Sequence, residues 1–322
     1  MTTSSEQPLK GSLQSKLSPP TLPPGTLVTG KWNGKKYRLE RLLGVGANGQ
    51  VYLATIGRSI CALKLGPEAA ELQGEANVLA SLDGARRARG KPPFLLDVDD
   101  YTRDGKDIPF YCMRYVPGSP LTSYLRRNGS QWIGVIGHRL LERLAELHEA
   151  GWVFSDLKSD NVLVHDYGRV DLVDYGGVTA IGRSVRQFTE IYDRGFWSAG
   201  SRTADSAYDW FAFAVLWLHA TDSKRLLLLS RTRLPQDRGV DDLMKLVHTN
   251  PKLRPLAEWM DRAFHGRFED TREALQAWRL ANRAKGAAAQ QGKAHIPAWM
   301  AGMLLASAAL CVSLVAVWLF QS

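Results

Sequence analysis

Three short motifs follow one another along this chain of 322 residues, and their order limits its fold more than any other feature. The first is the glycine-rich stretch LLGVGANGQVYLA, the second is DLKSDN and the third is DYG. Each motif is common when it stands alone. In this order they predict a site that holds the phosphates of a nucleotide and transfers one of them.

The glycine-rich stretch contains Gly44, Gly46 and Gly49. Glycines let a loop approach phosphates closely, because side chains at these positions would collide with them. The same G-x-G-x-x-G spacing occurs in dinucleotide-binding folds, where it ends a strand and begins a helix. Here the residues that follow, QVY, continue a strand pattern instead. We therefore expect two strands joined by a phosphate-covering loop rather than a dinucleotide site.

Further nucleotide-binding groups are expected next to this loop. Lys64 ends the CALK stretch and is expected to hold the α- and β-phosphates. Its expected carboxylate partner is Glu75, at the start of EANVLASL. Glu71 is the alternative partner, but the apolar residues that follow give Glu75 the better helical register. Val51 and Ala62 would cover one face of the adenine ring.

The DLKSDN and DYG motifs supply the remaining polar groups. Asp156 is the candidate base that orients the substrate hydroxyl, and Lys158 would neutralise charge on the γ-phosphate during transfer. Asn161 and Asp174 are the expected ligands of Mg²⁺, or of Mn²⁺ in its place, because hard cations prefer oxygen ligands. Phosphoryl transfer depends on positioning and charge neutralisation more than on covalent catalysis, and these residues offer both.

The apolar pattern divides the chain into a strand-rich front and a helix-rich back. Short alternating segments from residue 37 to residue 116 predict an antiparallel sheet with one helix, and helical spacing dominates from residue 121 onward. The sequence thus predicts an α+β fold of two lobes with a cleft between them, over residues 31–280. Residues 1–30 are rich in Ser, Thr, Pro and Gly, so we expect a disordered N-terminal arm.

Residues 296–320 carry no charged side chain. As a helix this segment would be about 37 Å long, enough to cross a hydrocarbon core of ~30 Å. We expect a single C-terminal transmembrane helix in the cell membrane, in contact with lipid and preceded by a basic linker over residues 281–295. The basic residues before the helix place the catalytic domain in the cytoplasm. The small residues Gly302 and Ala306 could pair two such helices into a homodimer.

The formal net charge of +9 favours anionic partners. Four basic residues gather in RRARGK, namely Arg86, Arg87, Arg89 and Lys91. One interpretation is a solvated loop. The other is a patch that binds DNA or another polyanion and thereby moves the Glu75 helix. The three cysteines are too far apart for a metal or disulfide framework, which fits a reducing compartment.

Over residues 36–280 the sequence resembles the eukaryotic-type (Hanks) Ser/Thr protein kinases of bacteria. The resemblance rests on LLGVGANGQVY, CALK, YCMRYVPG, DLKSDNVLV, DYGG and YDWFAFAVLWL. It implies the bilobal protein-kinase fold, and transfer of the ATP γ-phosphate to Ser/Thr hydroxyls of protein substrates. The uncharged tail and the stretch GRSVRQFTEIYDRGFWSAGSR are similar to the small membrane-tethered, YabT-like kinases of the Bacillus sporulation type.

The resemblance also implies roles for single residues. Met113 would be the gatekeeper, and Asp209, in the central apolar helix, would anchor the catalytic loop. Further residues that it implies for the nucleotide site are Leu43, Leu163 and, through their backbone, Arg114 and Val116.

Two departures from the family pattern bear on regulation. Phe154 and Ser155 stand where the family has His-Arg before the catalytic Asp, so a phosphate on the activation loop would lack its main cationic partner. Phe154 can still stack on Tyr175. No Ala-Pro-Glu precedes Asp209, so residues 177–208 are expected to be irregular and unlike the usual peptide-docking platform.

Two other function classes stay open. A pseudokinase scaffold would bind ATP without transfer, although all the polar positions needed for catalysis are present. A small-molecule phosphotransferase of the aminoglycoside or choline kinase kind would share Asp156 and Asn161, but Lys158 is more typical of protein kinases. Candidate autophosphorylation sites of a protein kinase are Thr179, Ser184 and Thr189.

Overall fold

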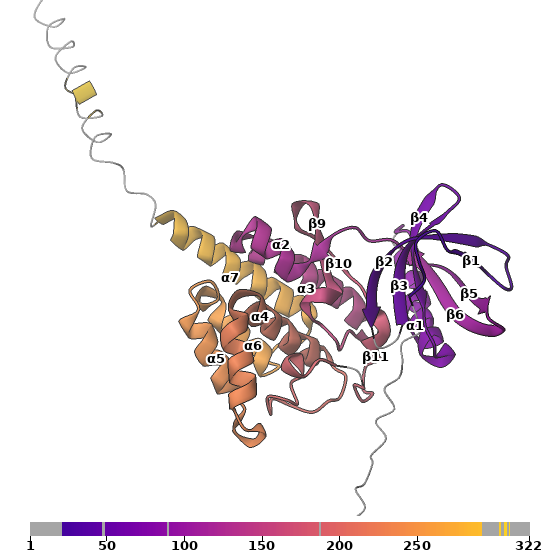
Figure 1. Cartoon of the computed structure of the whole chain (residues 1–322). Coiled ribbons are helices and arrows are strands. Elements are labelled where there is room, and N and C mark those ends of the chain that lie inside the picture. The colour runs from indigo at the N-terminus through magenta and orange to yellow at the C-terminus, as the bar shows by residue number, and fades with distance from the viewer. Residues whose placement is uncertain are drawn as a thin grey trace, which may run out of the picture.

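The computed structural model describes residues 21–46, 49–88, 90–186 and 188–291, together with residues 303, 306, 307 and 309. Its strands gather in an N-terminal lobe and its helices in the lobe that follows, as Figure 1 shows. Apart from those four residues, the predicted transmembrane segment 296–320 lies outside the described ranges. Within them, none of the helices combines the length and the apolar character needed to span a bilayer.

The N-terminal lobe is a six-stranded antiparallel sheet with the strand order β1-β2-β3-β4-β6-β5. Burial alternates at the start of β2, whereas Cys61–Leu65 of β4 are all buried. Tyr37 packs edge-on against Phe110 in the lobe's core, with ring centroids 5.5 Å apart. Helix α1 (Ala69–Ala88) lies against β5 and β6. The strands are β1 (Leu27–Thr29), β2 (Lys36–Gly46), β3 (Gly49–Ile56), β4 (Ser59–Leu65), β5 (Leu95–Arg103) and β6 (Lys106–Arg114).

The C-terminal lobe consists mainly of helices that surround α4. Residues 208–218 of α4 are all buried, as the apolar run YDWFAFAVLWL requires. Short strands β7 (Ser119–Pro120), β8 (Trp152–Val153), β9 (Val162–His165), β10 (Arg169–Leu172) and β11 (Thr179–Ala180) form two small sheets. The helices are α2 (Leu121–Asn128), α3 (Ile133–Glu149), α4 (Ser206–Thr232), α5 (Val240–Thr249), α6 (Ala257–Phe264) and α7 (Thr271–Gln291).

Helices α3 and α7 touch at a glycine. A Cβ atom on Gly137 would lie 2.2 Å from Cζ2 of Trp278, so a larger residue at this position would push the two helices apart. The indole nitrogen of the same tryptophan donates a hydrogen bond of 2.9 Å to the carbonyl of Gly134. The fully buried Trp278 therefore fixes α7 to the first turns of α3.

The predicted disordered arm over residues 1–30 is wrong for its C-terminal part. Residues 27–29 form β1, which pairs with β2. Val28 is fully buried, and the amide of Leu22 donates 2.8 Å to the hydroxyl of Tyr52. The buried side chains of Leu22 and Val28 thus hold this segment on the sheet, although its composition is typical of disorder.

The predicted linker over residues 281–295 also needs correction. Helix α7 continues to Gln291, so most of that segment is helical. Its alanines, glutamines and lysine are good helix formers, and they extend a helix that packing has already started. Helix α4 runs to Thr232, well beyond the apolar stretch YDWFAFAVLWL.

Candidate active site

Lys64 and Glu75 form a buried ion pair in the strand-rich lobe. Nζ of Lys64, on β4, lies 2.6 Å from Oε2 of Glu75, on α1. The hydroxyl of Tyr111, on β6, donates 2.9 Å to the same oxygen. Glu71, the alternative partner, is exposed on the same helix. The helical register that favoured Glu75 therefore selected the side chain that faces the lysine.

Asp174 approaches the same lysine from the other lobe. Its Oδ1 lies 3.1 Å from Nζ of Lys64. Burial lowers the pKa of Lys64, but the negative charges of Asp174 and Glu75 outweigh burial and raise that pKa above its ordinary value. Lys64 is therefore a permanent cation between two carboxylates, suited to a polyphosphate.

The backbone of Asp174 adopts an uncommon conformation. Its φ of 61° and ψ of 81° are left-handed, a region that residues other than glycine seldom occupy. Such a conformation persists where the surroundings fix it, and it occurs most often at functional sites. Tyr175, the next residue, is buried and packs edge-on against Phe154 with ring centroids 5.9 Å apart, as expected from the sequence.

Asp156 lies in the loop between β8 and β9, surrounded by hydrogen-bond donors. Nζ of Lys158 is 2.6 Å from its Oδ2, and Nδ2 of Asn161 is 3.3 Å from the same oxygen. Its Oδ1 accepts a bond of 2.9 Å from the hydroxyl of Thr189. These donors stabilise the ionised carboxylate and fix its orientation. A carboxylate held in this way can accept a proton from a substrate hydroxyl.

Asp209, on α4, anchors the catalytic loop (the residues between β8 and β9), as the resemblance implied. The amides of Phe154 and Ser155 donate 2.7 and 2.9 Å to its two carboxylate oxygens. Nε2 of His148, on α3, lies 3.0 Å from one of them, and Nδ1 of this histidine contacts the hydroxyl of Thr271. This fully buried carboxylate thereby connects the loop to two helices.

The glycine-rich loop joins β2 to β3 at the edge of the cleft. Gly49 has a φ of 130°, and a Cβ on it would lie 2.1 Å from the carbonyl oxygen of Leu65, so only glycine fits. Among the described residues, a Cβ on Gly44 or Gly46 would meet no atom within 4 Å beyond its chain neighbours. Space next to these two glycines is what an approaching phosphate requires.

The expected adenine-contacting residues come from both lobes. Ala62, on β4, pairs with Met113 on β6, and Val51 pairs with Lys64 across β3 and β4. The amide of Arg114 donates 2.8 Å to the carbonyl of Phe94, so this amide is not available to adenine. The remaining predicted positions are Leu43 on β2, Val116 after β6 and Leu163 on β9.

The donor set fits a magnesium ion shared with phosphates. Within the described ranges there is no group of three or more His, Cys, Asp or Glu side chains that could hold a metal alone. Magnesium usually takes one or two protein oxygens together with phosphate oxygens and water. The amide of Val173 donates 3.0 Å to the carbonyl of Asn161, which holds the adjoining Asp174 beside the catalytic loop. Asn161 and Asp174 could therefore serve as ligands together.

Residues 177–208 are largely irregular, as expected, but two arginine–aspartate pairs hold them. The guanidinium of Arg194 makes two hydrogen bonds, of 2.8 and 2.7 Å, to the carboxylate of Asp205. Buried Asp193 accepts 2.8 Å from Nε of Arg202 and 2.9 Å from the hydroxyl of Tyr208. Side chains of the segment itself thus hold its described residues in place, although it lacks the Ala-Pro-Glu of the family.

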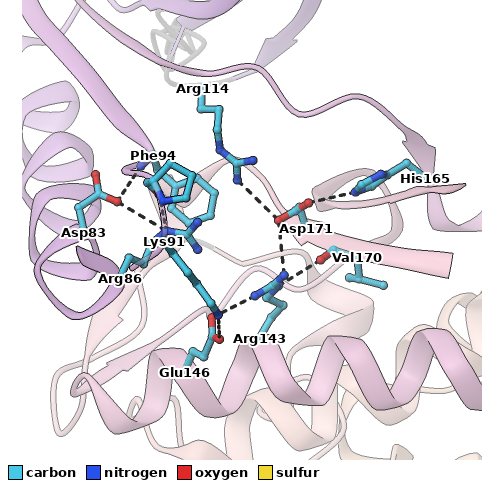
Figure 2. Close-up of polar contacts among 11 residues, drawn as sticks. Asp83, Arg86, Lys91, Phe94, Arg114, Arg143, Glu146, His165, Val170 and Asp171 are labelled. Carbon is cyan, nitrogen blue, oxygen red and sulfur yellow. Dashed lines mark hydrogen bonds and ion pairs between the residues drawn. The ribbon is translucent and has the colours of Figure 1, made fainter. Parts of the chain in front are cut away.

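The RRARGK residues divide between solvent and interior. Arg87 is exposed, and Arg89 lies outside the described residues. Nζ of Lys91 pairs with Oε1 of Glu146 on α3 at 2.7 Å. The guanidinium of Arg86 covers the ring of Phe94 at 3.8 Å. Figure 2 shows both of these side chains turned toward the protein.

Sequence reasoning missed two supporting residues, Tyr111 and His148, and it missed the positioning role of Thr189. Each one contacts a partner that lies far away along the chain, so local patterns could not reveal it. Thr189 was only a candidate phosphorylation site.

Comparison with known proteins agrees with this geometry. The protein kinase domain family matches residues 37–273. The chain is 36% identical over 255 residues to the serine/threonine-protein kinase YabT of Bacillus subtilis strain 168, a match that covers 79% of this chain and 73% of that protein. It is 30% identical over 150 residues to the serine/threonine-protein kinase PknE of Mycobacterium bovis, covering 45% and 26%. The structure of vaccinia related kinase 3 superposes with a TM-score of 0.61 at 17% identity, covering 82% of this chain and 92% of that one, and shows likeness of fold alone.

Proposed function

This chain belongs to the protein kinase family and is a serine/threonine protein kinase, and we propose that it works from the cell membrane with Asp156 as its catalytic base. Lys64 carries the proposal for the nucleotide site. It contacts Glu75 at 2.6 Å and Asp174 at 3.1 Å, so groups from both lobes already meet. Lys64, the cation that would bind the phosphates of a nucleoside triphosphate, is therefore already held in position.

The roles of the remaining residues follow from their contacts. Asp156 would accept the proton of a protein Ser or Thr hydroxyl, because its carboxylate is oriented by three donors. Lys158 lies beside it and would neutralise the transferred phosphoryl group. Bound Mg²⁺, held by Asn161 and Asp174, would offset the charge of the phosphates. The glycine-rich loop would cover them and exclude water.

The other function classes find no support in this geometry. A pseudokinase usually lacks one of the polar residues, whereas Lys64, Asp156, Asn161 and Asp174 are all present. The described residues of 177–186 and 188–208 support a protein substrate, because their hydrogen bonds hold a surface next to Asp156. A small-molecule phosphotransferase would need no such platform.

The activity is tested with the purified full chain in detergent, supplied with Mg²⁺ and labelled ATP. We expect label on protein Ser or Thr, and its loss in Asp156→Asn and Asp174→Asn. The exposed Asp166→Asn is a matched control and should keep full activity. Transfer to aminoglycosides or choline, with no label on protein, would contradict the proposal.

The membrane anchor rests on residues 296–320 and the basic residues before them. We expect the full chain in the membrane fraction even after an alkaline wash, and a chain that ends at residue 295 in the soluble fraction. Recovery of both chains in the same fraction would refute the anchor. Crosslinking of the full chain, with Gly302→Leu as the variant, would test whether the small residues Gly302 and Ala306 pair two helices.

A contact with DNA or another polyanion through Arg86, Arg87, Arg89 and Lys91 remains a prediction. Of the described members, Arg87 is exposed, whereas the Arg86 side chain is only 12% exposed and Lys91 is paired. Filter binding at two salt concentrations would test the contact, since phosphate contacts weaken steeply as salt rises.

A further inference from the structure

A cavity of about 40 Å³ lies where the end of α1, the start of β5, helix α3 and strand β10 meet. Its polar lining includes three basic side chains, Arg86, Lys91 and Arg143, and two carboxylates, Glu146 and Asp171 (Figure 2). None of its polar lining residues has a part in the proposed phosphoryl transfer. The cavity is lined by Leu82, Arg86, Lys91, Phe94, Arg143, Glu146, Leu147, Asp171, Leu172 and Tyr175.

Two arginines from separate elements line this cavity, and a third lies close by. Arg86, near the end of α1, and Arg143, on α3, belong to the lining, whereas Arg114, at the end of β6, does not. The guanidinium groups of Arg86 and Arg114 lie over the ring of Phe94, at 3.8 and 4.9 Å from its centroid. Figure 2 shows Arg114 and Arg143 on opposite sides of Asp171. Arg114 therefore adjoins the cavity through two of its lining residues, Phe94 and Asp171.

Arg143 has one close carboxylate partner, because its guanidinium donates 3.2 Å to Oε2 of Glu146. The other carboxylates near the three arginines lie farther away. Arg114 and Arg143 each approach the same oxygen of Asp171 at 3.9 Å, which is too long for a direct hydrogen bond. The other oxygen of Asp171 faces Nε2 of His165 at 3.2 Å. In the part of the chain that the structure describes, the one ion pair of Arg86 joins Asp83, also at 3.9 Å.

Asp83 is already engaged elsewhere. Its two oxygens accept hydrogen bonds of 2.7 and 2.9 Å from the amides of Phe94 and Leu95. In Arg86, Nε donates to the carbonyl of Pro92 at 3.1 Å. Its two terminal nitrogens have no hydrogen-bond partner among the described residues. Arg86 therefore has donors to offer to a further acceptor.

Two further observations indicate that a negatively charged group beside Arg86 and Arg114 would be stabilising. Nε of Arg114 is buried and has no hydrogen-bond partner within the described ranges. Burial lowers the pKa of Arg86, and the positive charges of Arg114 and Arg143 lower it further. Both costs would fall if an anion entered the cavity.

We propose that Arg86 and Arg143, with Arg114 beside them, form a binding site for a small oxyanion, either inorganic phosphate or the phosphoryl group of a small phosphomonoester. Guanidinium groups match the geometry of tetrahedral oxyanions and are less strongly hydrated than ammonium groups. The cavity has room for roughly three water molecules, and so for the oxygen atoms of one such group. The exposed fractions of Arg114 and Arg143, 35% and 32%, leave a route of entry.

The size of the cavity separates this site from a polyanion surface. Arg86, with its side chain 12% exposed, cannot contact the backbone of a DNA duplex without leaving Phe94. A bound oxyanion would instead connect the end of α1 to α3. Because α1 carries Glu75, occupancy would hold that carboxylate near Lys64. The site goes beyond the proposed phosphoryl transfer, since it lies outside the catalytic residues.

The site is tested by thermal unfolding of the full chain in detergent, titrated with sodium phosphate. A non-hydrolysable ATP analogue with Mg²⁺ is kept saturating, so that the nucleotide cleft cannot bind the added phosphate. Sodium chloride at matched ionic strength is the control for general salt effects. A parallel titration with glycerol phosphate distinguishes the two sources, and the ligand with the lower midpoint identifies the natural class.

We expect a saturable rise in the unfolding temperature for the wild type. Arg86→Gln should need at least about tenfold more phosphate for the same shift, because one guanidinium is lost. Arg87→Gln, one position further on the same helix and exposed, should respond like the wild type. Arg86→Lys keeps the charge and most of the packing, so a smaller but clear loss is expected even if Arg86→Gln folds poorly.

Two outcomes would overturn the proposal. One is equal responses to phosphate and to chloride in the wild type. The other is the same midpoint in the wild type, Arg86→Gln and Arg86→Lys. The readout does not depend on phosphoryl transfer, so failure of the kinase assay and failure of this site can be told apart.

Discussion

The hydroxyl of Thr189 donates a hydrogen bond of 2.9 Å to Oδ1 of Asp156. Thr189 belongs to the segment that we propose as the surface for the protein substrate, and Asp156 is the proposed base. The bond therefore couples the position of the substrate platform to the orientation of the carboxylate. A phosphate on Thr189 would place negative charge against Asp156, so this residue suits positioning better than activation by autophosphorylation.

Removal of this hydroxyl is predicted to lower the rate of transfer. Thr189→Ala should reduce kcat by about tenfold to a hundredfold, because a hydrogen bond to a charged group is worth roughly 1.5–3 kcal/mol. The KM for ATP should change little. Thr189→Ser should restore most of the activity, and Thr179→Ala, in the same segment, should remain near wild type. Steady-state kinetics with a peptide substrate give these values, and an unaltered kcat in Thr189→Ala would refute the positioning role.

The choice between Glu75 and Glu71 can be tested directly. Glu75→Gln removes the negative charge 2.6 Å from Lys64, so we expect kcat/KM for ATP to fall by at least about tenfold. Glu71→Gln, on the exposed side of the same helix, serves as the control and should have no effect. Nucleotide titrations and initial rates distinguish the two variants. Equal losses in both would mean that the helix as a whole, rather than this ion pair, supports binding.

The ion pair of Arg194 with Asp205 is predicted to stabilise the substrate platform. Arg194→Gln should lower the free energy of unfolding by about 2 kcal/mol, because Asp205 keeps part of its solvation when the partner is lost. The KM for peptide should rise while the KM for ATP stays constant. Arg183→Gln, exposed in the same segment, is the control. Urea denaturation and peptide kinetics check both parts, and a rise in the KM for ATP would contradict a local role.

Acid is predicted to destabilise the protein partly through His219. Burial lowers the pKa of His219, and the negative charge of Asp160 only partly offsets burial. The unfolded chain therefore binds more protons than the folded protein below the ordinary histidine pKa of about 6.5. This contribution to stability is present above that pH and is lost as the pH falls through it.

We therefore expect the unfolding temperature to fall between about pH 7.5 and about pH 5.5, and to fall less in His219→Gln. The glutamine can keep a hydrogen bond to Tyr192, whose hydroxyl contacts Nδ1 of His219 at 2.9 Å. His248→Gln, exposed on α5, should behave like the wild type. An identical pH dependence in His219→Gln and the wild type would exclude His219 as a source.

The sequence predicted those parts of the site that short motifs specify. The two lobes, the lysine and its glutamate, and the anchoring by Asp209 depend on patterns a few residues long, and the structure contains all of them. Strand β1 was missed because only its partner β2 makes it a strand. The donor from Tyr111 to Glu75 crosses from β6 to α1, and an alternating strand pattern does not show which tyrosine makes such a contact.

The RRARGK run illustrates a second limit. A cluster of positive charges in a sequence suggests a solvated surface, because burial of unpaired charge is costly. Here Phe94 and Glu146, which lie apart from each other along the chain, supply a ring and a carboxylate that turn Arg86 and Lys91 inward. The direction of a long side chain depends on neighbours that are distant in the sequence, and a local sequence pattern does not identify them.

The close contact between Gly137 and Trp278 connects the C-terminal helix α7 to α3. Helix α7 is the last described helix before the predicted anchor. Its Trp278 packs closely on Gly137 of α3 and donates a hydrogen bond to the carbonyl of Gly134. The far end of α3 carries His148, which touches Asp209 and so the loop that bears Asp156. If the proposed anchor holds the tail in a membrane, a force on the tail would act on α7 and, through the contact of Trp278 with Gly134 and Gly137, on the helix that carries His148.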